Sequence, residues 1–313
     1  MSAKIKILFV DFWWGFVPEE SYFYDMMGGD SAVEISATPD ILFHSNFGVK
    51  HREYGCFKVF FSSENERPCF FTSDVVLSSD YSNHSRHFRL PLFVFYAHRF
   101  NQSLLSFSNL STNFSIEDWS KRKFCCFLVS NPKSSIRLKF FDFLNSKRRV
   151  DSGGKVFNNI GYKIEHKLDF IKDYKFVIAF ENSKRDGYTT EKIFEPFLVN
   201  SIPIYWGNRR VSADFNKDSF VDVSEFRNFQ DVYDHLQKIE NSVDLASKMI
   251  ISKEVLPNDY IDSENVRNFI INQFNDRSLP VSQVRLYRLM SFIRKRFDYF
   301  YYFFKVVFKL NFS

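Results

Sequence analysis

The sequence FVIAF at residues 176–180 is an apolar run of strand length, and the polar stretch ENSKRDGY follows it at residues 181–188. Apolar residues at helical spacing come next, in TEKIFEPFLV at 190–199, and a second apolar run, IPIY, occupies 202–205. A strand, a helix and a strand in this order form a βαβ unit, which belongs to a parallel sheet. The segment therefore predicts an α/β fold that binds its ligand in the loop after the first strand.

Elements of the same two kinds flank this segment. The second half of the chain is expected to hold a strand at 124–129, a helix at 135–145, a glycine turn at 152–154 and a helix at 167–173. The first half is expected to hold strands at 4–12, 57–61, 75–77 and 91–96. We therefore expect two doubly wound lobes, 1–120 and 121–275, with a cleft between them, followed by a tail at 276–313.

The charge of the chain is concentrated at its carboxyl end. The net charge is +5, but residues 281–313 alone carry seven Lys and Arg residues against one Asp. The rest of the chain is therefore close to neutral, which gives no electrostatic reason to bind nucleic acid.

The helix expected at 190–199 begins in a way that suits an anion. Thr190 is a candidate N-cap, and Lys192 adds a full charge beside the free N–H groups of the first turn. A diphosphate is the ligand that this arrangement favours. An ordinary capped helix between two buried strands explains the same pattern.

Several motifs together resemble one family. The motifs are FENS at 180–183, GYTTEKI at 187–193, PIYWG at 203–207, SNP at 130–132 with Arg137, VDSGG at 150–154, WWG at 13–15, SENERP at 63–68 and RLP at 89–91. Taken together, and in the order in which they follow one another along the chain, these motifs resemble the bacterial α-1,3-fucosyltransferases of glycosyltransferase family 10. The resemblance implies the GT-B fold, built of two Rossmann-like lobes with the acceptor lobe first, and GDP-L-fucose as the donor.

The same resemblance assigns candidate site residues. The catalytic base is expected to be Glu64, with Glu66 as the alternative because the motif aligns either way. The donor-binding residues are expected to be Arg137, Asn182, Tyr188, Glu191, Lys192 and Gly154. No metal or other cofactor is expected, because Arg and Lys would stabilise the departing diphosphate. Each of these residues also has an ordinary structural explanation, and Pro196 departs from the family by interrupting the expected helix.

The tail has the pattern of a helix that lies on a membrane. Between residues 285 and 309 the cations form one stripe and Phe residues form the opposite face. Asp298 and Lys305 interrupt the apolar run, so a membrane-spanning helix is not expected. We expect the tail to bind an anionic membrane surface, with docking on the protein's own core as the alternative. The expected location is cytoplasmic, peripheral on the inner face of the inner membrane.

The expected activity is inverting transfer of L-fucose to O3 of GlcNAc in a Galβ1-4GlcNAc-type oligosaccharide acceptor, giving a Lewis x-type product on a bacterial surface glycan. Acceptor contacts are expected from loops such as 19–30 and 81–89. Two alternatives stay open. One is a fucosyltransferase of α-1,4 linkage or with another acceptor. The other is a non-catalytic, membrane-associated protein that binds a nucleotide sugar.

Overall fold

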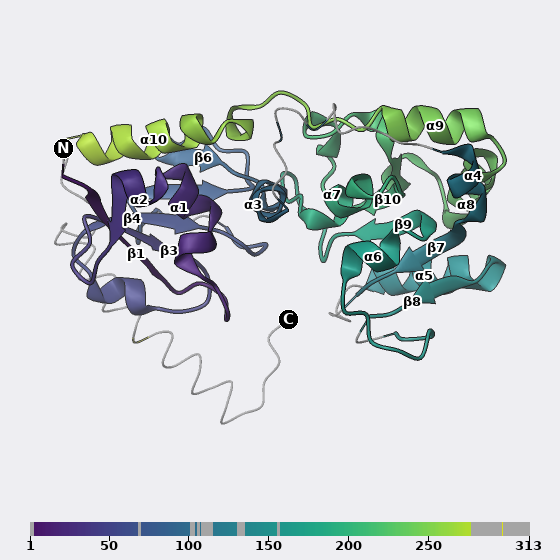
Figure 1. Cartoon of the computed structure of the whole chain (residues 1–313), viewed down its shortest axis with the longest axis horizontal. Helices are drawn as coiled ribbons and strands as arrows, with labels where there is room; N and C mark the ends of the chain where they lie inside the picture. The colour runs from purple at the N-terminus through teal and green to yellow at the C-terminus, as the bar shows by residue number, and fades with distance from the viewer. Residues whose placement is uncertain are drawn as a thin grey trace. The chain divides into compact units, whose positions relative to one another are not determined.

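The computed structural model describes residues 3–67, 70–100, 104, 107, 115–129, 135–154, 157–276 and 296. The chain forms two units (Figure 1). The first unit contains the chain up to Ser78, Ser82–Arg89 and the helix α10 (Ser263–Asn275). The second unit contains Ser79–Tyr81 and Leu90–Asp262.

The first unit is built on a six-stranded parallel sheet with the strand order β2-β1-β3-β4-β5-β6. Its strands are β1 (Ile5–Val10), β2 (Val33–Ile35), β3 (Ile41–His44), β4 (Phe57–Phe61), β5 (Val75–Ser78) and β6 (His87–Arg89). All residues of β3, β4 and β5 are buried, as in parallel strands that are covered on both faces. Because β2 and β3 lie on opposite sides of β1, the carboxyl ends of β1 and β3 form the topological switch point of this sheet.

Short helices and α10 accompany this sheet. The helices are η1 (Pro18–Glu20), α1 (Tyr22–Met26), α2 (Gly29–Ala32) and η2 (Lys50–Glu53). The α1 helix buries Tyr22, Phe23, Tyr24 and Met26, so half of the 19–30 loop that we expected to contact acceptor belongs to the core, with Ser21 and Met27 also buried. The α10 helix packs on α1, and its Phe274 ring lies 5.5 Å from that of Phe57.

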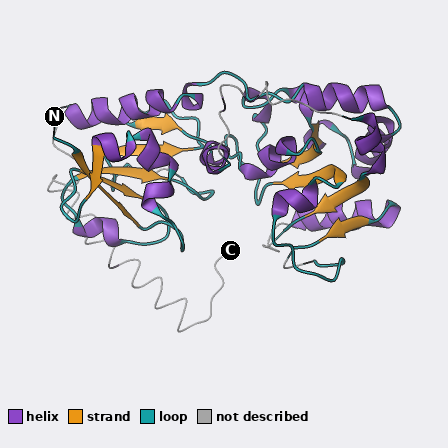
Figure 2. Cartoon of the chain, in the orientation of Figure 1, coloured by secondary structure: helices purple, strands orange, loops and turns teal. Residues whose placement is uncertain are grey.

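The second unit is built on a five-stranded parallel sheet with the strand order β11-β10-β9-β7-β8. Its strands are β7 (Lys123–Phe127), β8 (Val150–Ser152), β9 (Tyr174–Phe180), β10 (Ile202–Trp206) and β11 (Val221–Asp222). Figure 2 shows helices around the strands of each unit. Because β8 and β9 lie on opposite sides of β7, the switch point of this sheet is at the carboxyl ends of β7 and β9.

The helices of the second unit connect these strands. They are α3 (Leu92–Arg99), α4 (Ile116–Lys121), α5 (Ser135–Lys147), α6 (Lys167–Ile171), α7 (Glu191–Leu198), η4 (Val211–Ala213), η5 (Lys217–Ser219), η6 (Val223–Glu225), α8 (Phe229–Glu240), α9 (Val243–Ile251) and η7 (Asp259–Ile261). The α7 helix contacts both β9 and β10 and continues for two residues beyond Pro196. These two units confirm the prediction of two doubly wound parallel-sheet lobes.

The unit boundaries differ from those expected near residues 120 and 275. The α3 helix belongs to the second unit because it packs on α7, with the Phe93 ring 4.7 Å from that of Phe215. The α10 helix returns to the first unit. The strand expected at 91–96 is wrong, since α3 occupies this stretch. Periodicity does not separate a buried helix from a strand when most of its side chains are apolar.

The predicted tail lies almost entirely outside the described residues, which include only Asp276 and Arg296 beyond α10. Its amphipathic helix and its membrane contact therefore stay predictions. Among the helices of the described part, none combines the length and apolar character needed to cross a bilayer.

Candidate functional site

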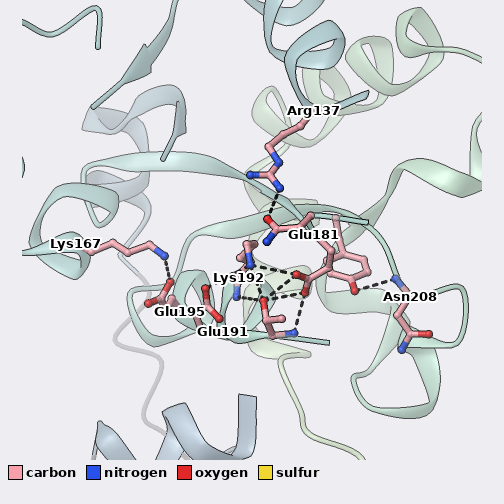
Figure 3. A network of polar contacts seen from close by, with 10 residues as sticks. Arg137, Lys167, Glu181, Glu191, Lys192, Glu195 and Asn208 are labelled. Atoms are coloured by element: carbon pink, nitrogen blue, oxygen red, sulfur yellow. Dashed lines mark hydrogen bonds and ion pairs between the residues drawn. The ribbon is translucent and has the colours of Figure 1, made fainter. Parts of the chain in front are cut away.

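Glu181 is the first residue of the loop that follows β9, and its side chain binds residues at the other end of that loop. Its side chain is fully buried, and its backbone N–H donates to the Trp206 carbonyl at 2.8 Å. One carboxylate oxygen accepts from the Thr190 N–H at 2.8 Å, and the other accepts from Lys192 Nζ at 3.2 Å (Figure 3). Burial raises the pKa of Glu181, although the charge of Lys192 acts in the opposite direction. The loop is thus held by a buried carboxylate that the sequence motif had placed only as a neighbour of Asn182.

The start of α7 gathers charge, as predicted. Thr190 is the N-cap, and its hydroxyl oxygen accepts from the Lys192 N–H at 3.4 Å. Lys192 Nζ donates to the Thr190 hydroxyl at 2.9 Å and lies 3.4 Å from a Glu191 carboxylate oxygen. Burial disfavours charge on Lys192, but Glu181 and Glu191 outweigh it and raise the pKa of the ammonium. Burial likewise opposes ionisation of Glu191, but Lys192 and Lys167 outweigh it and lower the Glu191 pKa.

Arg137 reaches the same place from the first turn of α5, the helix that follows β7. Its side chain is 2% exposed, and Nη2 donates to the Asn182 Oδ1 (Figure 3). Burial lowers the pKa of Arg137, opposed by Glu181, but a guanidinium remains charged at neutral pH. Its buried Nε has no partner among the described residues. A buried N–H without a partner is costly, so this donor favours an anionic ligand.

The five predicted donor residues other than glycine therefore lie together in the second unit. Asn182 accepts from Arg137, and Lys192 contacts Glu191. Tyr188 is buried and interacts electrostatically with both cations. The site lies at the carboxyl ends of β7 and β9, which is the switch point of the sheet.

Gly187 fixes the far side of the loop. Its φ is +88°, and a Cβ there would lie 2.1 Å from the Ser79 carbonyl oxygen, so the position requires glycine. Its N–H donates to the Asn208 side chain at 2.8 Å. Arg185 forms a bidentate ion pair with Asp80 nearby. These contacts explain why Ser79–Tyr81 belongs to the second unit.

Gly154 has a packing reason that sequence reasoning did not foresee. A Cβ at this position would lie 2.1 Å from the carbonyl oxygen of Val129, the second residue after β7. The close approach that the glycine permits is therefore to the chain's own backbone. Its contact with a donor stays a prediction.

Sequence reasoning missed an ion pair beside these residues. Glu195 is 5% exposed, lies one turn after Glu191 on α7, and pairs with Lys167 at the start of α6 (Figure 3). Burial raises the pKa of Glu195, opposed by Lys167. The four-residue spacing from Glu191 was a signal for Glu195. Nothing in the sequence pointed to Lys167, because it comes from a separate helix.

The two candidate bases lie in the first unit, on the loop after β4. Both Glu64 and Glu66 are exposed. Glu66 Oε2 accepts from Asn46 Nδ2 at 2.7 Å, and the Asn46 Oδ1 accepts from the Ser63 N–H at 3.1 Å. Glu66 thus helps to join the loop after β4 to the loop after β3.

One group among the described residues has the composition of a metal site. Asp11, His44 and His51 offer ligand atoms within 4.8 Å of one another. The two imidazole rings, however, are stacked at 4.1 Å with an interplanar angle of 14°. Imidazole lone pairs lie in the ring plane, so two nearly parallel stacked rings do not both point at one ion. The Asp11 carboxylate instead accepts from the N–H groups of Lys50 and His51, each at 2.9 Å. The three residues therefore fit a structural role, in which Asp11 holds the start of η2.

Two family models match the chain. The model described as "Alpha-(1,3)-fucosyltransferase FucT N-terminal domain" matches residues 7–96, and "Glycosyltransferase family 10 (fucosyltransferase) C-term" matches residues 119–248. The Helicobacter pylori "Alpha-(1,3)-fucosyltransferase FucT" is 34% identical over 58% of this chain and 43% of the relative. The human "4-galactosyl-N-acetylglucosaminide 3-alpha-L-fucosyltransferase 9" is 29% identical over 44% of this chain and 39% of the relative. The chain thus spans less than half of these relatives' length.

Solved structures agree with the family models. An α1,3-fucosyltransferase solved with GDP matches 90% of this chain and 93% of its own, with a TM-score of 0.75 and 26% identity. The same kind of enzyme solved with GDP-fucose matches 88% of this chain and 92% of its own, with a TM-score of 0.74. Because models of one family match both units and the fold agrees along most of the chain, the protein belongs to glycosyltransferase family 10, the fucosyltransferases, and has their GT-B fold.

Proposed function

We propose that the protein transfers L-fucose from GDP-L-fucose to a sugar hydroxyl with α-1,3 linkage. The observation that carries the proposal is the buried Arg137 guanidinium, whose Nε has no partner among the described residues, beside Lys192 at the start of α7. A diphosphate supplies the anionic oxygens that both side chains prefer. The relatives named for this activity and the homologous structure with GDP-fucose support the choice of donor.

In this proposal the cations of the second unit stabilise the leaving diphosphate. Arg137 offers its Nε–H to one phosphate oxygen and keeps Asn182 on Nη2. Lys192 exchanges the Glu181 oxygen for a phosphate oxygen, and Glu181 retains the Thr190 N–H. Tyr188 donates its hydroxyl to the same phosphates, and Glu191 accepts from a hydroxyl of the fucose or ribose. The cations act on charge that grows as the bond breaks, which is where electrostatic stabilisation accelerates a reaction.

The chemistry proposed is an inverting displacement. The acceptor oxygen bonds to C1 of fucose while the bond from C1 to the diphosphate oxygen breaks, and the hydroxyl proton passes to Glu64. Glu64 is the first choice because the family motif aligns with it, and Glu66, whose carboxylate accepts from Asn46 Nδ2, stays the alternative. No metal or other cofactor is part of this proposal, since Arg137 and Lys192 take the role of a metal ion.

For the acceptor we propose O3 of GlcNAc in a Galβ1-4GlcNAc-type glycan, giving a Lewis x-type product. The name of the human relative specifies a 4-galactosyl-N-acetylglucosaminide, which supports this choice. We further propose that the enzyme works on a bacterial surface glycan, as a cytoplasmic protein held at the inner membrane by the basic tail at 285–309.

The direct test incubates the protein with GDP-fucose and N-acetyllactosamine, and follows released GDP and the mass of the product. A fucosylated trisaccharide with a 1→3 linkage by NMR is expected, and the rate should persist in EDTA. GDP-mannose serves as the control donor and a type 1 chain as the control acceptor. A folded protein that binds GDP-fucose but fucosylates neither acceptor would contradict the proposal, and a 1→4 product would correct its linkage.

A further inference from the structure

Trp14 is the large hydrophobic residue with the greatest exposure in the described structure, at 99%. It lies on the loop that follows β1, and so at the switch point of the first sheet. Ligands of open parallel sheets bind at this position. A Trp ring that is wholly in solvent buries no apolar area within its unit, and this one stands at a ligand-binding edge of the sheet.

The loop that carries Trp14 is held firmly. The Phe16 N–H donates to the Trp13 carbonyl at 3.2 Å, and Gly15 has a φ of +78°, as in a type II turn with Trp14 at its corner. The rings of Phe12 and Phe16 stack at 4.1 Å below the turn. Trp14 is therefore presented on an ordered turn, which reduces the entropy lost when a ligand binds.

The neighbouring loop, which follows β3, is joined to the Trp14 loop. The Phe47 N–H donates to the Asp11 carbonyl at 3.0 Å, and the Phe47 ring lies 6.3 Å from the Trp13 ring in an edge-on arrangement. Phe47 is 50% exposed, so the loop after β3 carries a second partly exposed aromatic ring. Asp11 has a φ of +60° and clamps the far end of this loop through its carboxylate.

Polar groups adjoin the aromatic surface. Asn46, directly before Phe47, links through its amide to the loop that carries Glu64 and Glu66. A surface with exposed aromatic faces beside amide and carboxylate groups suits a sugar, which has an apolar C–H face and hydroxyls around its edge. A lipid surface would have to accept these exposed carboxylates, whereas a glycan can donate hydroxyl hydrogens to them.

We propose that Trp14, with Phe47 on the neighbouring loop, is the platform on which a pyranose ring of the acceptor glycan stacks. The inference rests on the proposed transfer to a glycan and adds the subsite that determines acceptor affinity. It replaces the 19–30 loop, half of whose residues are buried, with the loops after β1 and β3.

The test compares the full-length Trp14→Ala and Trp14→Phe variants with the wild type by initial rates at varied N-acetyllactosamine. In Trp14→Ala, kcat/KM for the acceptor is expected to fall by about tenfold or more, mainly through KM, as when a central interface Trp is truncated. Trp14→Phe should recover much of this loss. The KM for GDP-fucose and its slow hydrolysis without acceptor should not change, which also shows that the variants fold.

Phe71→Ala is the matched control. Phe71 is an aromatic residue of the same unit with 62% exposure, and it precedes Asp74, whose N–H donates to the Lys58 carbonyl near the start of β4. It therefore lies toward the opposite edge of the sheet, and its removal should leave the acceptor KM unchanged.

The outcomes separate the two proposals. A wild type that binds GDP-fucose but transfers to no glycan overturns the proposed function and this inference with it. An active wild type whose acceptor KM is the same in Trp14→Ala, or changes equally in Phe71→Ala, overturns the inference alone. A Trp14→Ala variant that loses only self-association or binding to anionic vesicles, with its acceptor KM intact, overturns it as well.

Discussion

The two sheets share a topology at their switch points but not the chemistry placed there. At the ends of β7 and β9 the second unit buries charges, with Arg137 and Glu181 withdrawn from water and Lys192 partly buried beside them. At the ends of β1 and β3 the first unit exposes aromatic rings, with Trp14 fully in solvent. Buried cations suit a small anion that they can surround. An exposed aromatic face suits a neutral ligand that keeps much of its hydration.

This difference implies a division of labour between affinity and specificity. Interactions among buried charges are strong because little water screens them, so the second unit can hold a nucleotide sugar tightly. Stacking on an exposed ring is weaker and tolerates related sugars, so the first unit can distinguish acceptors without holding them long. This interpretation requires that the candidate base, Glu64, and the aromatic surface around Trp14 act on the same acceptor.

Replacement of Glu64 by Gln should have the largest effect on activity. The amide keeps the shape of the side chain but takes no proton, so transfer should fall by about 10²–10⁴-fold while GDP binding stays intact. Rates with N-acetyllactosamine and calorimetry with GDP measure the two properties. Glu66→Gln is the matched control, and a loss of at most a few-fold is expected because its role is to hold Asn46. A larger loss in Glu66→Gln would make Glu66 the base.

Replacement of Arg137 by Ala tests the role of the buried cations in the second unit. Loss of one charged donor from the diphosphate should lower kcat/KM for GDP-fucose by about 10²–10³-fold. The melting temperature should change little or rise, because the variant no longer buries a guanidinium with an unpartnered Nε. Initial rates at varied GDP-fucose measure the first change, and calorimetric scans without and with GDP measure the second. A variant that is much less stable without ligand would show that Arg137 serves mainly the fold.

The second unit was the more predictable from sequence. Its strands at 176–180 and 202–205 and its helices near 135–145 and 190–199 were confirmed, because their apolar periodicity is long and their caps are polar. The donor residues came from a motif that is nearly continuous in sequence. Lys167 was missed because its partner Glu195 belongs to another helix, and no local pattern records such a contact.

The first unit was harder to read. The strands β2, β3 and β6 have only three or four residues, which is too short for a clear alternation. The stretch that forms α3 was expected to be a strand of the first lobe because residues 91–96 are all apolar, but it is a helix of the second unit. Trp14 was visible in a motif, but only the structure shows that its ring is exposed while the neighbouring Phe12 and Phe16 are packed.

The buried charges also predict how stability depends on pH. Burial raises the pKa of Glu181, so the folded state binds this proton more tightly than the unfolded state does. Its contribution to the free energy of unfolding therefore falls as pH rises from about 4.3 through the raised pKa. Glu181→Gln should remove that decline, at a cost of about 1–3 kcal/mol from weakened hydrogen bonds to Thr190 and Lys192. Urea unfolding at a series of pH values tests this, and an equal decline in the variant contradicts it.

The Lys167–Glu195 pair should give the smallest effect, and it shows whether burial or charge is decisive in the second unit. The Lys167 side chain is 40% exposed and that of Glu195 only 6%, so Lys167→Met leaves a buried carboxylate without its partner. We expect the free energy of unfolding to fall by about 1–2 kcal/mol at pH 7, between the values for exposed and buried pairs. Lys172→Met is the matched control, because the Lys172–Asp169 pair is more than half exposed on both sides and should contribute less.

The Glu195 pKa is raised, so at lower pH its carboxyl is protonated in both proteins and the difference between Lys167→Met and wild type should shrink. A difference that stays constant from pH 7 to acidic pH would mean that the loss does not arise from the ion pair between Lys167 and Glu195.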